Sequence, residues 1–426
     1  MEFLRAWRQK LRTPVVRNAG YLIASEAVAG TLGLVFWGVA ARLFPNDADI
    51  GLAAILINGA TLLALLSTLG FNVSLVRFIG EPSAPIARMI NSSVTIGCAV
   101  AILLATLFGM GAGVFLPRLA FLASNPGLLI LFAAFTAIWT VSLLFDAAFV
   151  GLGRAKYVFI RTAVYNLLKI PLPAALVIVV VAPFALFSAW GLALLAANIL
   201  AALVLLERVV PGYRLRPDLD RATVRPMVRY SAANHTTNVL AAVPGLLFPL
   251  LVATALRPEN AAYFYIAWVL SNFLFIIPGS IFTSVFAEGS RWRPGLKGNA
   301  IDGLFLSLGV LIPAVAAVIL AGPLVLGALK STFASQSAPL LNILAASSFF
   351  VAINALYTAY MRVEKRMRPV IGLYAGTTLG ALALVFPLTW VVGLPGAGLA
   401  FGIAQGTGAA FALSAMVREG VLRRGP

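Results

Sequence analysis

The feature that most constrains this chain is a series of about twelve apolar segments, each long enough to cross a lipid bilayer as a helix. A transmembrane helix needs roughly 20 mainly apolar residues, whereas the strands of a membrane barrel are about half that length. The segments lie near residues 18–43, 50–72, 92–117, 127–150, 157–182, 186–206, 231–255, 260–284, 299–322, 335–360, 370–392 and 394–417. The sequence therefore predicts an all-α integral membrane protein with about twelve transmembrane helices.

Composition limits the class of protein further. Of the 426 residues, 61% are hydrophobic and only 11% are charged, which is too apolar for a soluble fold to cover with polar surface. The net charge of +17 does not indicate a nucleic-acid binder, because the basic residues are spread between the apolar segments. A single cysteine and a single histidine exclude a disulfide framework and a thiolate or histidine-rich metal centre, so we expect no cofactor.

The basic residues also predict the orientation in the membrane, because Lys and Arg in short loops are retained on the cytoplasmic side. Of the 31 basic residues, 26 fall at the two termini and in alternate connections, and Lys169 lies inside a segment. The opposite side has only Arg42, Arg118, Arg257 and Lys330. We therefore expect an even number of spans, with both termini in the cytoplasm.

The two halves of the chain resemble each other. The longest polar connection, residues 207–229, separates six segments from six. A shift of 213 residues superposes 43–48 on 256–261 and pairs polar residues inside the apolar segments. These pairs are Asn18 with Ser231, Tyr21 with Asn234, Ser25 with Asn238 and Asn58 with Ser271.

The similarity of the halves indicates a parallel repeat. Because six spans per half return the chain to the cytoplasm, the pseudo-twofold axis runs along the membrane normal, as is typical of alternating-access transporters. We expect an N-terminal six-helix lobe at residues 1–206, a cytoplasmic linker at 207–230 and a C-terminal six-helix lobe at 231–426. The expected fold is thus two six-helix bundles related by a pseudo-twofold repeat.

Lys169 is the most deeply placed cation in the sequence. It lies about 12 residues, or ~18 Å, beyond the start of the fifth segment and so near the bilayer midplane. Arg161, Tyr165 and Lys169 are spaced by four and share a helix face, with Asn166 beside them. Two prolines follow at once and predict a kink or break in the helix. We expect Lys169 to line a cavity; the alternatives are snorkelling to the interface or pairing with a carboxylate.

Three further ionisable residues are candidates for ion coupling. Glu26 shares a polar patch with Tyr21 and Ser25 in the first segment, where it is either a proton or sodium carrier or half of a static ion pair. Asp146, near the cytoplasmic end of the fourth segment, is expected to be structural. His235 could titrate near neutral pH, although an interfacial hydrogen bond is the simpler role.

The seventh segment has a polar patch that mirrors the patch in the first. Ser231, Asn234, His235 and Asn238 lie on one side of the predicted helix. We expect the two patches to face each other across a shared cleft.

Several classes of activity lack the residues they need. The sequence contains no Walker-type nucleotide loop and no soluble domain long enough for a nucleotide fold, so direct ATP hydrolysis is not expected. No nucleophile–base pair is visible, so we do not expect an enzyme. A channel would need a filter motif or a ring of like charges. Transport by conformational exchange is the expected activity.

The N-terminal third of the chain resembles a known family. The relevant stretches are Asn-Ala-Gly-Tyr at 18–21, Ala-Arg-Leu-Phe at 41–44, Gly51, Leu-Gly-Phe at 69–71, Leu-Val-Arg at 75–77 and the turn Gly-Leu-Gly-Arg at 151–154. Their order and spacing resemble the pattern of the bacterial polysaccharide flippases. These are the O-antigen and exopolysaccharide flippases of the multidrug/oligosaccharidyl-lipid/polysaccharide exporter superfamily.

The resemblance implies a substrate and a route. Two six-helix bundles would surround a central cleft, through which a polyprenyl-diphosphate-linked oligosaccharide passes from the cytoplasmic to the outer leaflet of the bacterial plasma membrane. Diphosphates need positive partners. The candidate cations are Lys169, Arg161, Arg42 and Arg77, and the candidate polar lining is Tyr21, Ser25, Tyr165, Asn166, Asn234 and Asn238. The implied partners are the lipid-linked glycan, membrane lipids and other assembly proteins such as a polysaccharide polymerase.

Other activities remain as alternatives. An ion-coupled multidrug/cation antiporter of the same superfamily would carry paired acidic residues on the opening helices of a lobe, and only Glu26 qualifies. A peptidoglycan-precursor flippase would carry extra spans and more cavity arginines. A membrane-embedded glycan polymerase or ligase would need a large outer loop with catalytic residues, and every predicted outer loop is short.

Overall fold

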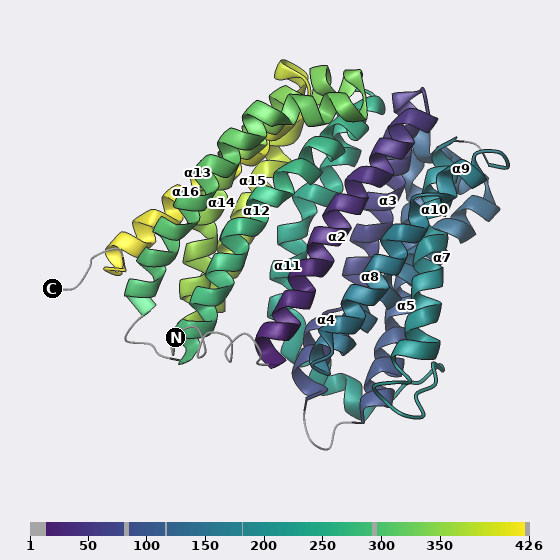
Figure 1. Cartoon of the computed structure of the whole chain (residues 1–426), viewed down its shortest axis with the longest axis horizontal. Coiled ribbons are helices and arrows are strands. Elements are labelled where there is room, and N and C mark those ends of the chain that lie inside the picture. Colours follow the sequence, from purple (N-terminus) through teal and green to yellow (C-terminus); the bar gives the residue numbers. More distant parts are fainter. Residues whose placement is uncertain (1–13, 81–84, 116, 181, 292–295, 422–426) are drawn as a thin grey trace, which may run out of the picture. The chain divides into compact units, whose positions relative to one another are not determined.

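The computed structural model describes residues 14–80, 85–115, 117–180, 182–291 and 296–421, and all regular structure in these ranges is helical (Figure 1). The first half contains α2 (Pro14–Leu43), α3 (Asp47–Ser67), α4 (Phe71–Phe78), α5 (Ile86–Phe115), η1 (Pro117–Leu119), α6 (Ala120–Ser124), α7 (Pro126–Gly151), α8 (Ala155–Lys169), α9 (Leu172–Leu176), α10 (Ala182–Leu200) and η2 (Ala201–Leu205). The second half contains α11 (Arg221–Ala255), α12 (Glu259–Arg291), α13 (Leu296–Leu329), α14 (Ser331–Val363), α15 (Met367–Val392) and α16 (Pro395–Arg418). Outside the described residues lie some of the basic residues used to predict the orientation, namely Arg5, Arg8, Lys10, Arg12, Arg293, Arg423 and Arg424.

Eleven helices of the described residues are long and apolar enough to cross a membrane. The predicted span near 157–182 is instead broken into α8 and the short α9. Pro171 and Pro173 lie at the break, where each removes a backbone donor and crowds the preceding turn. The predicted break is confirmed, and it explains why eleven and not twelve helices qualify by length.

The described chain forms two compact units. The first comprises Met1–Leu43 and Leu56–His235, and the second comprises Phe44–Ile55 and Thr236–Pro426. These limits differ from the predicted lobes, because one boundary falls inside α11 and the start of α3 belongs to the second unit.

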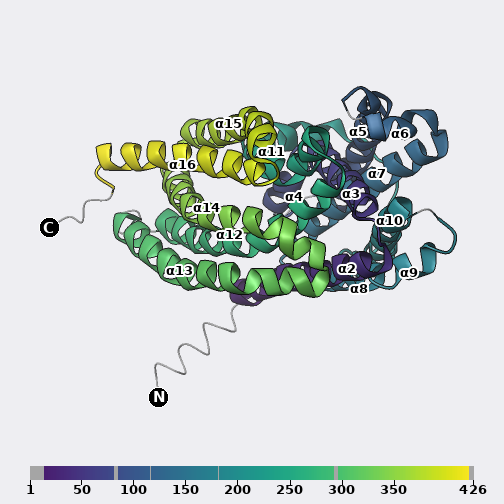
Figure 2. The same cartoon turned by 90° about the horizontal axis from the view of Figure 1, so that it is seen from above.

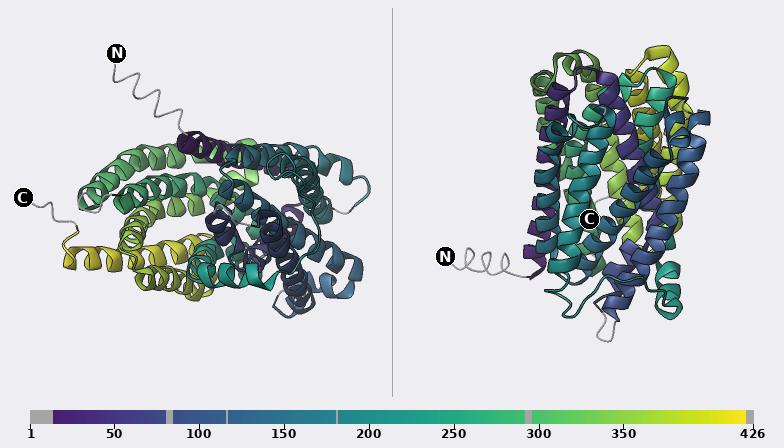
Figure 3. Two further views of the ribbon diagram at one scale, coloured as in Figure 1. Left: turned by 90° about the horizontal axis from the view of Figure 1, so that it is seen from below. Right: turned by 90° about the vertical axis from the view of Figure 1, so that its right-hand side faces the viewer.

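Within each unit the long helices pack side by side. In the first unit α2 lies against α8 and α5 against α7, and its purple-to-teal helices run nearly parallel in the right-hand view of Figure 3. In the second unit α12 packs against α13 and α14, and α16 packs against α14 and α15 (Figure 2).

The helix bounds confirm the predicted repeat. The shift of 213 residues carries 182–205, spanned by α10 and η2, onto 395–418, the bounds of α16. The same shift carries α5 onto 299–328, close to the bounds of α13, and α2 onto 227–256, close to those of α11. The long helices therefore follow each other in the same order in both halves.

One break in the first half was not predicted. The continuous helix α12 corresponds to α3 and α4 together, which are separated by Leu69 and Gly70. Both residues are left-handed, with φ of 48° and 82°. This conformation suits glycine and strains a leucine. A side chain at Gly70 would also collide with Ser231 of α11, so the break gives α11 a place to pack closely.

The predicted linker is an ordered part of the first unit. The Tyr213 hydroxyl donates to Asn91 Oδ1 of α5 at 3.0 Å, and Asn91 Nδ2 donates to the Arg214 carbonyl at 3.0 Å. The amide of Asp218 donates to the Thr95 hydroxyl at 3.0 Å. Burial raises the pKa of the Tyr213 phenol, which keeps it protonated as a donor. The connection therefore lies along the start of α5, and α11 begins within it.

One carboxylate of the segment Phe44–Ile55 bonds to three side chains of the second unit. Asp47 Oδ1 pairs with Lys330 Nζ at 2.5 Å. Asp47 Oδ2 accepts hydrogen bonds from the Tyr263 hydroxyl at 2.8 Å and from the Thr332 hydroxyl at 2.9 Å. We call these four residues the Asp47 clasp. It joins the starts of α3, α12 and α14.

Glycines permit close helix packing in both units. Gly51 of α3 lies so near the Pro258 carbonyl that a β-carbon there would collide with it, and Gly191 of α10 lies in the same way against the Phe135 ring of α7. Lipid tails are as apolar as leucine, so helices in a bilayer associate through such close contacts and not through hydrophobic transfer from water.

Candidate functional site

The predicted polar stripe lies on α8, in the first unit. Arg161, Tyr165 and Lys169 are only 4%, 7% and 7% exposed, and Asn166 is 1% exposed. Because α8 packs against α2, α7 and α10, the stripe faces the interior of this unit. Burying two cations inside a membrane protein costs free energy, so each cation needs a partner that compensates its charge.

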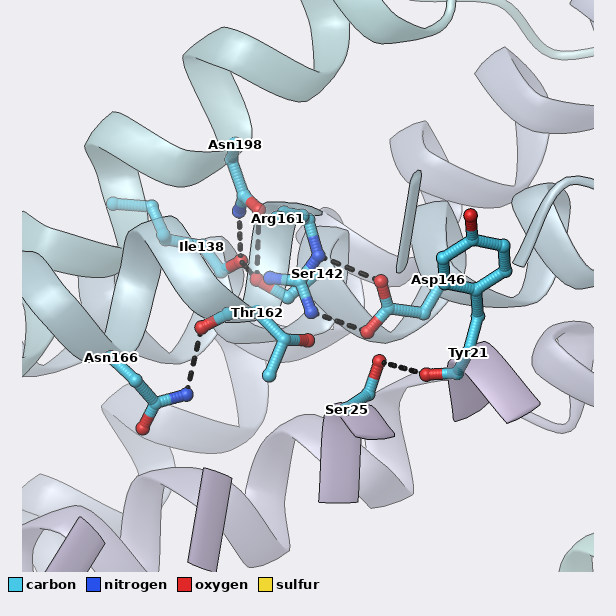
Figure 4. Close-up of polar contacts among 9 residues, drawn as sticks. All are labelled: Tyr21, Ser25, Ile138, Ser142, Asp146, Arg161, Thr162, Asn166 and Asn198. Carbon is cyan, nitrogen blue, oxygen red and sulfur yellow. Dashed lines mark hydrogen bonds and ion pairs between the residues drawn. The ribbon is translucent and has the colours of Figure 1, made fainter. Parts of the chain in front are cut away.

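Arg161 has its partner on α7 (Figure 4). Its Nε donates to Asp146 Oδ1 at 2.7 Å and its Nη2 pairs with Asp146 Oδ2. This two-point geometry matches the planar guanidinium to the carboxylate. Asp146 thus has a structural partner, and it neutralises Arg161, one of the four cations predicted to bind substrate. The remaining Nη1 is buried and has no hydrogen-bond partner among the described residues.

Lys169 lies among aromatic rings. Its ammonium is 4.7 Å from the centroid of Tyr165 and 5.4 Å from that of Phe36 on α2. No ion pair to a carboxylate of the described residues involves Lys169. A desolvated cation–π contact contributes about 2 kcal/mol, whereas removing an ion from water costs several kcal/mol. The ammonium therefore retains a strong capacity to bind an anion.

Further polar atoms without partners lie around the α8 stripe. Asn166 Nδ2 donates to the Thr162 carbonyl of its own helix at 2.8 Å, but Asn166 Oδ1 is buried and unpaired within the described chain. Trp139 Nε1 is also unpaired there, and its ring lies 6.1 Å from that of Tyr165. Buried polar groups are usually satisfied. Their presence on and beside the α8 stripe indicates a place for water or a polar ligand.

A hydrogen-bonded pair fixes α10 beside this site (Figure 4). The Ser142 hydroxyl of α7 donates to Asn198 Oδ1 at 2.9 Å, and Asn198 Nδ2 donates to the Ile138 carbonyl at 2.7 Å. Sequence reasoning missed Ser142 and Asn198, as well as Trp139. An amide such as Asn198 inside an apolar segment was the one signal available.

The first-segment candidates lie on α2, which packs against α8. The Ser25 hydroxyl donates to the Tyr21 carbonyl at 2.9 Å, so its proton is used within its own helix (Figure 4). The Tyr21 ring lies 6.1 Å from Phe159 of α8. Glu26 is exposed and interacts electrostatically with Asp146.

Two predicted cations lie at helix ends. Arg42 and Arg77 are exposed, in the last turns of α2 and α4, and the Arg77 guanidinium lies 5.7 Å from the Phe78 ring. This placement corresponds to the anchoring role that charge distribution alone predicts. It differs from the buried position of Lys169.

The seventh-segment candidates lie on α11 in different surroundings. His235 hydrogen-bonds to the Leu66 carbonyl, and its Nδ1 is buried without a partner in the described chain. Ser231 contacts Ser74 of α4 through the two hydroxyls. Asn234 is half-buried, and Asn238 is exposed and belongs to the second unit.

Motifs that carry the family resemblance meet in the first unit. Asn18 Nδ2 donates to the Gly153 carbonyl at 2.9 Å. Gly151 lies against the α4 backbone, where a β-carbon would be 2.8 Å from the Leu75 carbonyl oxygen and 3.1 Å from Val76 Cα. These spacings are therefore explained by packing between the start of α2, the end of α4 and the turn after α7.

The fold and the site define the class of protein. Repeated sets of long apolar helices, with one predicted span broken beside a buried polar site, define a multi-pass membrane protein. The chain belongs to the family described as polysaccharide biosynthesis protein, whose model matches residues 15–287. No curated protein sequence matches the chain.

Solved structures share the fold. The lipid II flippase MurJ in an inward closed conformation has a TM-score of 0.76 at 14% identity, covering 93% of this chain and 87% of that chain. An inward-facing multidrug resistance MATE family transporter of the MOP superfamily has a TM-score of 0.73 at 16% identity, covering 94% and 98%. A MOP superfamily transporter from Pyrococcus furiosus has a TM-score of 0.64 at 16% identity, covering 97% and 96%.

Proposed function

We propose that this protein is a flippase that moves a polyprenyl-diphosphate-linked oligosaccharide from the cytoplasmic to the outer leaflet by alternating access, for the synthesis of cell-surface polysaccharide. Membership of the polysaccharide biosynthesis family supports the glycan, and the transporter fold supports translocation. The observation that carries the proposal is the buried ammonium of Lys169, which has no carboxylate partner among the described residues.

The chemistry of the site suits a lipid-linked diphosphate. Its head group carries negative charge, for which a buried cation is the strongest hydrogen-bonding partner. Arg161 Nη1 supplies a second free donor while Asp146 holds the guanidinium in place. The lipid tail would remain in the bilayer, since only the polar head group needs a polar route.

The proposal includes a location and partners. We place the protein in the bacterial plasma membrane with both termini cytoplasmic, because 26 of the 31 basic residues then face the cytoplasm. A polysaccharide polymerase that uses the translocated units is the proposed protein partner.

The observed pairing of Asp146 disfavours the antiporter alternative. A cation antiporter needs a carboxylate free to exchange ions, and Asp146 is engaged by Arg161. Glu26 is the remaining acidic candidate in the first unit. The peptidoglycan-precursor alternative shares the lipid-diphosphate chemistry and differs in the glycan.

The test is to delete the gene and to measure surface polysaccharide together with its lipid-linked intermediates. We expect loss of surface glycan and accumulation of complete oligosaccharide units that cannot be reached from outside the cell. Complementation with the wild-type gene should restore both.

Other outcomes point to the alternatives. Unchanged glycan and intermediates with altered sensitivity to cationic drugs would contradict the flippase and favour the antiporter. Accumulation of peptidoglycan precursors with normal surface polysaccharide would favour the peptidoglycan-precursor flippase.

A further inference from the structure

The second unit contains a cavity of about 260 Å³ between α11, α12, α14, α15 and α16. Aromatic rings and amides line it, among them Trp268, Phe275, Phe401, Asn272, Asn354 and Gln405. No charged side chain is among its lining residues. It adjoins a second cavity of about 370 Å³, and the two share Gly279, Ala355 and Tyr374 in their walls.

The aromatic wall of this cavity is held in place from several sides. The Trp268 ring lies 5.1 Å from Phe401 in an edge-to-face contact and 5.7 Å from Phe275. Phe264 stacks on it at 5.7 Å with an interplanar angle of 18°. Gly245 of α11 lies so close to the indole that a β-carbon there would collide with it. Such mutual contacts give a rigid aromatic surface.

The side-chain amides that line the cavity include one acceptor oxygen without a hydrogen-bond partner among the described residues. Asn354 Nδ2 donates to Gln405 Oε1 at 2.7 Å and to the Gln405 carbonyl at 3.1 Å. Asn354 is only 7% exposed, yet its Oδ1 has no partner in the described part of the chain. A buried acceptor left unpaired costs about 1–3 kcal/mol, so this atom favours a ligand that brings a donor.

We propose that this cavity binds one uncharged glycosyl residue of the transported lipid-linked oligosaccharide, an inference that rests on the proposed function. The C–H face of a pyranose ring packs on aromatic rings, and its hydroxyls both donate to and accept from side-chain amides. The volume lies just below the roughly 300–1,000 Å³ of sites for drug-sized ligands, which suits a single sugar ring. The absence of charge in the lining disfavours a phosphate or a uronate in this cavity.

The neighbouring cavity has a different chemistry. It is lined by Arg362, whose Nε is buried and unpaired within the described chain, together with Thr283 and Thr358. The hydroxyls of Thr283 and Thr358 donate to the Gly279 and Ala355 carbonyls of their own helices and so offer acceptor oxygens, whereas Arg362 offers a free donor. The sugar site and a site with a guanidinium are thus adjacent in one unit.

The experiment compares two ligands on the full chain in lipid nanodiscs. One ligand is undecaprenyl diphosphate, and the other is undecaprenyl diphosphate carrying one uncharged hexose, tested as glucose, galactose and N-acetylglucosamine. We expect at least one glycosylated form to bind the wild type more tightly than the bare diphosphate. Trp268→Ala should remove that gain, about tenfold or more, and leave binding of the bare diphosphate unchanged. Asn354→Leu should weaken the same ligand about threefold to tenfold.

The controls separate this inference from the proposed function. Trp390→Ala removes a tryptophan that is 69% exposed on α15 and should change neither affinity. If Trp268→Ala fails to fold, Asn354→Leu alone decides the outcome. Equal binding of both ligands by the wild type, or equal weakening of both by the variants, would overturn the sugar site alone. Failure of the wild type to bind either ligand would overturn the proposed function and the sugar site with it.

Discussion

The two halves of the chain have the same helix order but place different side chains at matching positions of their fifth helices. The shift of 213 residues carries Arg161 onto Tyr374, Tyr165 onto Thr378 and Lys169 onto Leu382. The first unit buries two cations there, whereas α15 offers hydroxyl groups and a leucine. A repeated scaffold keeps its packing while its sites take on different chemistry. The difference agrees with a diphosphate site in the first unit and a neutral sugar site in the second.

The halves also differ in helix continuity. The first unit breaks its helices at Leu69–Gly70 and at the two prolines after α8, and both breaks lie beside the predicted site residues His235 and Lys169. The corresponding helices α12 and α15 continue without interruption, although each contains a proline. Breaks free backbone groups at membrane depth, where they line polar sites. The half of the chain with interrupted helices is thus also the half that buries Arg161 and Lys169.

The largest effect is expected from removing the carboxylate that neutralises Arg161 in the first unit. Asp146→Ala leaves a buried guanidinium unpaired, which we expect to lower stability by about 3–5 kcal/mol. The measurement is unfolding of the purified protein in mixed micelles. The double variant Asp146→Ala with Arg161→Leu should recover most of this loss. The exposed pair Arg366–Glu419 of the second unit is the matched control, and its loss should not measurably change stability. An equal effect of both pairs would contradict the assigned difference.

A substitution that gives position 169 the residue of the matching position in the second unit tests whether the buried ammonium binds the substrate. Lys169→Leu introduces the residue found at position 382 and removes a charged donor, worth about 1.5–3 kcal/mol. We expect translocation of the lipid-linked oligosaccharide to fall roughly tenfold to a hundredfold, with stability unchanged or raised. Lys156→Leu, an exposed position on the same helix, is the control. Equal loss in both variants would indicate a general effect of charge and not a site.

The left-handed break tests the difference in continuity. Gly70→Ala places a side chain at φ 82° and against Ser231, so we expect a loss of about 1–3 kcal/mol in stability. Gly309→Ala in α13, which has open space around it, should be neutral or stabilising by up to about 1 kcal/mol. Thermal unfolding of both variants provides the measurement. An unchanged unfolding temperature of Gly70→Ala would show that stability does not require the left-handed conformation at this break.

The smallest expected effect concerns the connection between the halves. The Thr223 hydroxyl and the amides of Ala222 and Thr223 hydrogen-bond the Asp220 carboxylate and hold its pKa below the ordinary value. A lowered pKa gives stability that is present above the unfolded-state value, near pH 4, and is lost as the pH falls through the folded-state value. Asp220→Asn should flatten the dependence of the unfolding midpoint on pH in this range. An unchanged pH profile would contradict the assigned bonds.

Much of the fold could be predicted from the sequence because the bilayer fixes the length of a span and proline breaks a helix by covalent geometry. The break at Leu69–Gly70 could not, since it contains no proline and glycine is tolerated inside membrane helices. In the site, the shared face of Arg161 and Lys169 follows from their spacing. The pairing of Arg161 with Asp146 depends on how two helices pack, and the amides Asn354 and Gln405 carry no charge to reveal them.

The Asp47 clasp has a consequence for the independence of the halves. Phe44–Ile55 belongs to the first half of the sequence but packs as part of the second unit. The second unit therefore depends on a segment that precedes the C-terminal half. A gene cut between the six-helix repeats would yield a C-terminal fragment whose Lys330, Tyr263 and Thr332 lack their shared acceptor.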